Sequence, residues 1–187
     1  MSYCIGPFDL FDIIFIKQRN NYRLYINNNN NNSRIILRTP LMNIPFGVEK
    51  YKYKDILNLE FSNVNTNKMY NFLTAIKQID NFFINIMTND IKYKIKNKLP
   101  YNLLENIKGK SYVSCIKYRK NFDSLFRTHL RKTKNNIKSI FKDTDDRLLN
   151  IMDLKTNNGN FNIELESLWI SNDSYGIIYY INEGVII

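Results

Sequence analysis

One segment of this chain has the periodicity of a helix, whereas almost every other apolar segment has the periodicity of a strand. Apolar residues recur three and four positions apart over residues 69–86, the spacing that gathers side chains on one face of an α-helix. Asn65 or Thr66 is expected to cap this helix. We interpret its apolar face as one that packs on a sheet. That face consists of Met69, Phe72, Leu73, Ile76, Ile79, Phe83 and Ile86.

The other apolar segments predict strands. Residues 56–61 alternate between apolar and polar side chains with the period of a half-buried strand. Residues 111–119 predict a second strand, and alternation across a sheet would place Val113 and Cys115 in the core with Tyr112 on the opposite face. Further strands are predicted at residues 10–17, 22–26, 33–39, 51–54, 91–98, 126–132, 137–141, 161–169 and 176–181.

Many short strands, one helix about midway along the chain and no regular strand–helix alternation predict a mainly β fold. Five or more strands with one central helix are typical of a small closed barrel. Hydrophobic residues form 44% of the chain, and the Ile, Phe and Tyr that dominate them favour strands. The 187 residues fit a single domain over residues 1–187. The asparagine run at residues 27–32 is expected to be a polar, low-complexity loop.

Positive charge is concentrated in residues 91–142, which we call the basic block. It contains fifteen Lys or Arg and two acids, a net charge of +13, whereas the whole chain carries +10. From residue 143 onward the net charge is −6. Seven aromatic residues are interleaved with the cations of the block: Tyr93, Tyr101, Tyr112, Tyr118, Phe122, Phe126 and Phe141.

The basic block has two interpretations. Cations neutralise a phosphate backbone and aromatic rings stack on unpaired bases, so the block fits a surface for single-stranded nucleic acid. It equally fits a solvated basic face whose aromatic residues belong to an ordinary core. For each ring, Trp169 included, packing in the core remains the alternative to base stacking.

The motifs of catalysis are absent from the sequence. It contains no GxxxxGK[ST] or GxGxxG loop, no HExxH and no CxxC. The acidic cluster at residues 143–146 is interpreted as a solvated turn, although such carboxylates hold the divalent ion of some nucleases. Nothing in the sequence brings His129, Cys115 and Asp123 together as a nucleophilic site. We therefore expect non-covalent binding, with no enzymatic activity, no metal and no cofactor.

The sequence favours a reducing compartment. The N-terminal apolar run contains Asp9 and Asp12 and has no preceding basic region, which argues against a signal peptide. No uninterrupted apolar stretch has the length of about 18 residues that a membrane-spanning helix needs. Cys4 and Cys115 form neither a paired framework nor a metal motif, so both are expected to be buried thiols. The expected location is the cytoplasm or the nucleus, without secretion or membrane insertion.

Four short motifs, spread in order over most of the chain, resemble a known family. They are TPLMNIPFGVE at residues 39–49 with the strand at 56–61, the helix around residues 72–79, YVSCIK at residues 112–117, and LWI with GIIY at residues 168–170 and 176–179. Together they resemble the phage-type single-stranded DNA-binding proteins of large nucleocytoplasmic DNA viruses. None of the motifs is a catalytic signature.

The resemblance implies an OB-like five-stranded barrel over residues 1–187 that binds single-stranded DNA during viral replication, recombination or repair. It implies a viral replication site in the host cytoplasm, or the nucleus, as the location. Replication proteins such as a polymerase, helicase or primase, and further copies of the chain, become candidate partners. One departure concerns the C-terminus, because phage members end in an acidic tail with a terminal aromatic residue, whereas residues 182–187 are mostly apolar.

The predicted mechanism combines electrostatic contacts with base stacking and no sequence preference. A viral structural protein, or an RNA-binding protein that coats nucleic acid, is the alternative, and a metal-dependent nuclease using Asp143 or Asp145 is a third. The predicted nucleic-acid-binding residues are Arg34, Arg38, Lys110, Tyr112, Lys117, Tyr118, Arg119, Lys120, Arg127, Arg131, Lys132 and Trp169.

Overall fold

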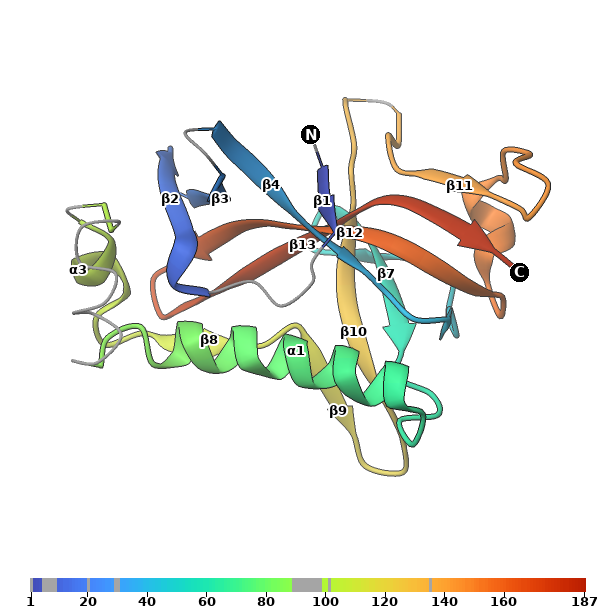
Figure 1. Cartoon of the computed structure of the whole chain (residues 1–187), viewed down its shortest axis with the longest axis horizontal. Coiled ribbons are helices and arrows are strands. Elements are labelled where there is room, and N and C mark those ends of the chain that lie inside the picture. Colours follow the sequence, from blue (N-terminus) through green and yellow to red (C-terminus); the bar gives the residue numbers. More distant parts are fainter. Residues whose placement is uncertain are drawn as a thin grey trace. The chain divides into compact units, whose positions relative to one another are not determined.

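The computed structural model describes residues 2–4, 10–19, 21–28, 31–88, 99–100, 102–134 and 136–187. It is mainly β, with a closed five-stranded barrel and one main helix (Figure 1), which confirms the predicted fold class. The strand predicted at residues 91–98 lies outside the described residues. Among the described residues, no helix combines the length and the apolar character needed to cross a bilayer.

The chain divides into two compact units, each assembled from three segments that are far apart in sequence. Unit 1 comprises Met1–Ile36, Ala75–Ser114 and Leu165–Ile178. Unit 2 comprises Leu37–Thr74, Cys115–Glu164 and Tyr179–Ile187. The single domain over residues 1–187 stays a prediction.

Unit 1 is built on the antiparallel hairpin of strands β2 (Ile13–Gln18) and β3 (Asn21–Asn28). Strand β3 also pairs with β4 (Asn31–Arg38) and, in antiparallel register, with β12 (Asn158–Ile170). Strand β1 (Ser2–Cys4) runs parallel to β4, and β8 (Ser111–Val113) runs parallel to β13 (Ser174–Ile186). The short helices η1 (Leu10–Asp12) and α3 (Leu103–Ile107) complete this unit.

Unit 2 is built on strand β10 (Phe122–Leu130). Strand β10 pairs antiparallel with β7 (Lys54–Glu60) and β9 (Ile116–Arg119), and parallel with β13. Strand β7 continues to β6 (Val48–Tyr51) and β5 (Met42–Asn43), and β13 continues to β11 (Ile140–Lys142). The short helix η3 (Ile151–Leu154) completes the unit.

A cluster of aromatic rings fills the core of unit 2. The Phe126 ring lies 6.0 Å from that of Phe61, 5.9 Å from that of Phe72 and 4.9 Å from that of Tyr179, measured between centroids. All four residues are buried. Edge and tilted contacts of this kind stabilise a core beyond the area that the rings bury, so the cluster ties β10 and β13 to the first turns of helix α1 (Asn67–Ile84).

Helix α1 confirms the helix that the apolar stripe predicts. Thr66 caps it, since the Thr66 hydroxyl oxygen accepts a hydrogen bond from the Met69 amide at 3.4 Å. Every residue of the stripe is buried except Leu73, which is half-buried. Phe83 of this face packs edge-on against Phe15 of β2 in unit 1, with 6.2 Å between ring centroids.

Three predicted strands differ in the structure. Residues 52 and 53, inside the strand predicted at 51–54, form the turn of the β6–β7 hairpin, because Lys52 and Tyr53 adopt positive φ angles of 52° and 70°. The strand at 56–61 is buried on both faces rather than one. The strand predicted at residues 111–119 breaks after Val113, which is exposed rather than buried.

Other boundaries shift without changing the fold class. The first residues of the strand predicted at 10–17 form η1, and the last two strands are longer than predicted, with 13 residues each. The loop predicted at residues 27–32 is shorter than expected, because its ends belong to strands: Asn27 pairs with Asn32 and Asn28 with Asn31 in the β3–β4 ladder. Ladder hydrogen bonds join backbone groups, so a run of asparagines can extend two strands.

The aromatic cluster leads to a stability prediction within one strand. Phe126→Ala should lower the free energy of unfolding by about 3–5 kcal/mol, because it leaves a cavity at a fully buried ring. Phe122→Ala is the matched control, since Phe122 begins the same strand and is 73% exposed. Chemical denaturation of both variants would measure the difference. Equal losses would contradict the assignment of Phe126 to the core.

Candidate nucleic-acid interface

One sheet face in unit 2 carries cations and aromatic rings side by side. In the β7–β10 ladder Arg127 lies opposite Asn58 and His129 lies opposite Ile56. Residues opposite each other in an antiparallel ladder point to the same face, and the neighbouring Phe126 points into the core. We call this the cation–aromatic face. Its charged, polar and aromatic members on strands β6, β7, β9 and β10 are Glu49, Tyr51, Lys54, Asn58, Glu60, Lys117, Arg119, Phe122, Arg127 and His129, and Glu49 Oε2 accepts a hydrogen bond from Asn58 Nδ2 at 2.5 Å.

Arg119 lies between two exposed rings at one end of this face. Its guanidinium carbon is 5.9 Å from the centroid of Phe46 and 5.3 Å from that of Phe122. The same guanidinium donates to Glu60 Oε1 at 2.5 Å and to the Asp123 carbonyl at 2.6 Å. These two hydrogen bonds fix the cation, and both rings keep exposed surface on which a base can stack.

Arg127 lies against Tyr51 in the middle of the face. Its guanidinium carbon is 4.2 Å from the ring centroid, within the range of a cation–π contact. Arg127 Nε, Asn58 Oδ1 and His129 Nδ1 are buried and have no hydrogen-bond partner among the described residues. Buried polar atoms are normally satisfied by protein, water or ligand, so this part of the ladder offers donors and acceptors to a bound group.

His129 stays neutral on this face at physiological pH. Burial, and after it the positive charges of Lys54 and Arg127, lower its pKa from 6.5 to about 4. Its ring lies 5.8 Å from that of Tyr180, between centroids. The Arg131 guanidinium covers Tyr180 at 4.9 Å, so the alternation of rings and cations extends from β10 onto β13.

Besides Arg119, two further predicted cations have carboxylate partners in unit 2. Arg131 donates to Glu164 Oε2 at 2.6 Å and to Asn182 Oδ1 at 2.7 Å, and Glu164 is almost completely buried. Lys132 reaches Asp55 Oδ2 at 3.0 Å, and Lys50 pairs with the other oxygen of the same carboxylate. Hydrogen bonds from Lys50 and then from Lys132 hold the pKa of Asp55 below its usual range, against the opposing effect of burial.

Eight of the twelve predicted residues belong to unit 2, and three of them lie on the cation–aromatic face. Those three are Lys117, Arg119 and Arg127. Tyr118 is 71% exposed and points to the opposite side of β9 by alternation, and Lys120 lies in the β9–β10 turn. The remaining three are Arg38, Arg131 and Lys132.

The other four predicted residues belong to unit 1, and the contacts of three of them are internal. The Tyr112 hydroxyl donates to Asp80 Oδ1 at 2.6 Å, and its ring packs edge-on against Tyr175. Lys110 donates to the carbonyls of residues 171 and 172, both at 2.6 Å. The Trp169 indole lies over Gly176, where a Cβ would be 3.0 Å from the ring. Arg34, the fourth, is exposed on β4.

The described strands of the basic block are divided between the two units. Strand β8 pairs with β13 in unit 1, whereas β9 pairs with β10 in unit 2. The break falls at Ser114, whose hydroxyl donates to Asp80 Oδ2 at 2.5 Å. Asp80 is buried on α1, which raises its pKa. Two hydroxyl donors for one buried carboxylate hold β8 to the helix in unit 1.

Sequence reasoning missed three rings of the interface as site residues: Phe46, Tyr51 and Phe122. Phe122 follows the Lys120–Asn121 turn inside the basic block, and this position among cations could have indicated a role in binding. Phe46 lies in a turn and Tyr51 at the end of β6. They contact cations that are at least 70 residues away in sequence, so no local pattern indicates their role.

The acidic cluster at residues 143–146 forms a turn. Asp143 Oδ1 accepts hydrogen bonds from the amides of Asp145 and Arg147, both at 2.9 Å. Asp146 and Asp145 are exposed and pair with Lys142 and Arg147, each at 3.3 Å. Within the described ranges, no group of three or more His, Cys, Asp or Glu residues is arranged to hold a metal ion.

No protein-family model and no curated protein matches the chain. Among solved structures, the chain is similar to gp2.5, a single-stranded DNA-binding protein encoded by bacteriophage T7. The TM-score is 0.48 and the identity is 8%, and the match covers 81% of this chain and 91% of the phage chain. The family of large nucleocytoplasmic DNA viruses stays a prediction.

The position of His129 predicts a pH dependence of stability. Because its pKa is lowered in the folded state, the unfolded chain binds more protons between pH 6.5 and about 4. Its contribution to stability is therefore present above about pH 6.5 and is lost as the pH falls towards 4, up to about 3 kcal/mol. Chemical denaturation of the wild type and of His129→Gln at about pH 6.5 and about pH 4 would measure this loss in the free energy of unfolding.

His129 is the only histidine in the chain, so the NMR titration of its imidazole is unambiguous. A midpoint near the model-peptide value of about 6.5 would contradict its burial between two cations.

Proposed function

We propose that the chain binds single-stranded DNA without sequence preference through the cation–aromatic face. The observation that carries this proposal is the alternation of guanidinium groups and rings: Arg119 between Phe46 and Phe122, and Arg127 against Tyr51. Cations neutralise phosphates, whereas a ring accepts any base, because every base has a π-face. Unpaired bases alone expose that π-face, so the arrangement favours a single strand over a duplex.

Each part of the face has a distinct role in this proposal. Phe122 and Phe46 stack on bases, which is worth about 1–3 kcal/mol per base. Arg127 and Lys117 contact phosphates, since no described acidic side chain is paired with either. Arg119 is held by Glu60 and orients the rings on either side of it. Asn58 and His129, on the same face, offer polar atoms to the DNA strand.

The biological setting follows from the motif resemblance and belongs to the same proposal. We place the activity in the replication, recombination or repair of viral DNA, in a cytoplasmic replication site or the nucleus of the host. A polymerase, helicase or primase, and further copies of the chain, are the partners that such a role requires. Binding without catalysis is part of the proposal.

Base stacking predicts the effect of removing one ring. Phe122→Ala should weaken the binding of fluorescently labelled oligo(dT) by about 5- to 150-fold, the equivalent of one stacked base. Tyr70→Ala is the matched control, because Tyr70 is also exposed in unit 2 but lies on helix α1. Fluorescence anisotropy would measure both. The same affinity for both variants would remove Phe122 from the interface.

Phosphate contacts predict a salt dependence. The logarithm of the affinity for oligo(dT) should fall with the logarithm of salt concentration by about 0.7 per neutralised phosphate. Arg127→Gln should reduce this slope by about 0.7, whereas Lys68→Gln, an exposed cation at the start of α1, should leave it unchanged.

The same assay separates the alternatives. Affinity that is independent of salt, or a preference for duplex over oligo(dT), would exclude the proposed function. Tighter binding of oligo(rU) than of oligo(dT) would instead assign the face to RNA, because the 2′-hydroxyl distinguishes the two strands.

A further inference from the structure

A small hollow in unit 1 is lined by cations and by no acid. Its volume is about 280 Å³, at the lower end of small-ligand sites. The lining residues are Lys17, Arg19, Tyr22, Asn106, Lys110 and Ile170. Three positive charges without a carboxylate among six lining residues make this hollow suited to an anion.

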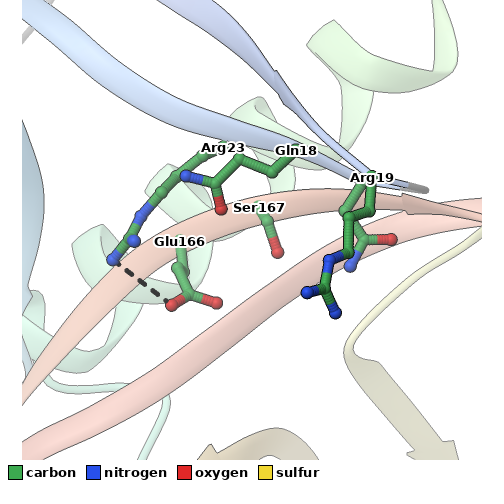
Figure 2. Close-up of a pocket in the computed structure, with 6 residues that line it drawn as sticks. Gln18, Arg19, Arg23, Glu166 and Ser167 are labelled. Carbon is green, nitrogen blue, oxygen red and sulfur yellow. Dashed lines mark ion pairs between the residues drawn. The ribbon is translucent and has the colours of Figure 1, made fainter.

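Arg19 also lines a neighbouring hollow, where an acid is present but is paired with another residue. Arg23 Nη2 lies 3.5 Å from Glu166 Oε1. Figure 2 shows the Arg23 guanidinium directed towards Glu166, whereas the Arg19 guanidinium lies apart from this pair. Among the described residues, Arg19 has no acidic partner. Its charge and its five N–H donors therefore remain available to the hollow.

Two other lining groups, the Lys110 ammonium and the Tyr22 hydroxyl, are held in place by hydrogen bonds, and each keeps one unused hydrogen-bond donor. The Lys110 ammonium donates to the carbonyls of Ser171 and Asn172, and because an ammonium has three N–H groups, one remains. The Tyr22 hydroxyl accepts a hydrogen bond from Asn106 Nδ2 at 2.9 Å, which leaves its own O–H to donate. The hollow thus offers fixed donors from Lys110 and Tyr22 beside the side chains of Lys17 and Arg19.

The backbone conformation of Arg19 suits a glycine and so offers a way to remove the side chain. Its φ angle is +50°, in the left-handed region, where a non-glycine residue is strained by about 1 kcal/mol or more. It follows Gln18, whose partner across the β2–β3 ladder is Asn21, and short hairpin turns of this kind favour Asn or Gly.

We propose that this hollow binds a phosphate group, with Arg19 as the principal ligand and Lys17, Lys110 and Tyr22 as further donors. Phosphate is the anion class that fits, because a guanidinium fork and an ammonium meet its oxygens at several points. The site takes inorganic phosphate or the terminal phosphate of an oligonucleotide. It lies within unit 1 and does not rest on the proposed function of the cation–aromatic face.

Arg19→Gly gives a test that separates binding from folding. This variant removes the cation and supplies the residue that adopts a positive φ at no steric cost. The affinity for inorganic phosphate, measured by NMR titration of the full chain, should fall about tenfold or more. The melting temperature without phosphate should stay the same or rise.

Two more variants complete this experiment. Lys17→Gln should weaken phosphate binding in the same direction as Arg19→Gly. Lys77→Gln is the control, because Lys77 is an exposed cation of unit 1 on helix α1 and does not line the hollow. Absence of saturable phosphate binding, or equal affinity of the wild type and Arg19→Gly, would overturn the proposal.

A pair of dinucleotides identifies the source of the phosphate. If the site takes a strand terminus, 5′-phosphorylated dithymidylate should bind more tightly than its 5′-hydroxyl form, and Arg19→Gly should abolish the difference. Equal binding of the two, together with saturable inorganic phosphate binding, would assign the site to the free anion. Phe122→Ala should keep phosphate binding in either case, so failure of the cation–aromatic face and failure of this site are distinguishable.

Discussion

The antiparallel pairing of β7 with β10 is the constraint on which the rest of unit 2 depends. It sets Phe126 opposite Leu59 on the core side and Arg127 opposite Asn58 on the other side. A shift of the register by one residue would exchange these two faces. The aromatic cluster around Phe126 opposes such a shift, so packing inside the barrel also positions the candidate interface outside it.

The candidate interface is partly neutralised by its own acids. Glu60 holds Arg119, and Glu164, almost completely buried, holds Arg131. Such pairs add little to the net charge, but they fix the guanidinium planes against the neighbouring rings, and an immobilised side chain loses less entropy when a ligand binds. The face therefore combines cations that are prearranged with cations, such as Arg127, that keep their full charge.

The sequence predicts local structure well and assembly poorly. The apolar stripe and Thr66 identify helix α1, and alternation identifies β12, because both signals lie within one segment. The division of the basic block between two units is not visible locally, since it follows from the pairing of β8 with β13. The contact between Phe46 and Arg119 cannot be predicted locally either, because it joins residues that are far apart in the sequence. Three of the predicted cations, Lys117, Arg119 and Arg127, lie on the candidate face. Their charges occupy alternate positions of β9 and β10, and that pattern is visible within each segment.

The neutral imidazole of His129 has a consequence for how a strand would leave the cation–aromatic face. Because its pKa is lowered to about 4, the only histidine of the chain adds no charge to the face near neutral pH. A change of pH near neutrality therefore does not alter the charge of this imidazole. If the face binds a strand as proposed, release would come from competition, either by a protein that carries its own negative charge or by an enzyme that pulls the strand away.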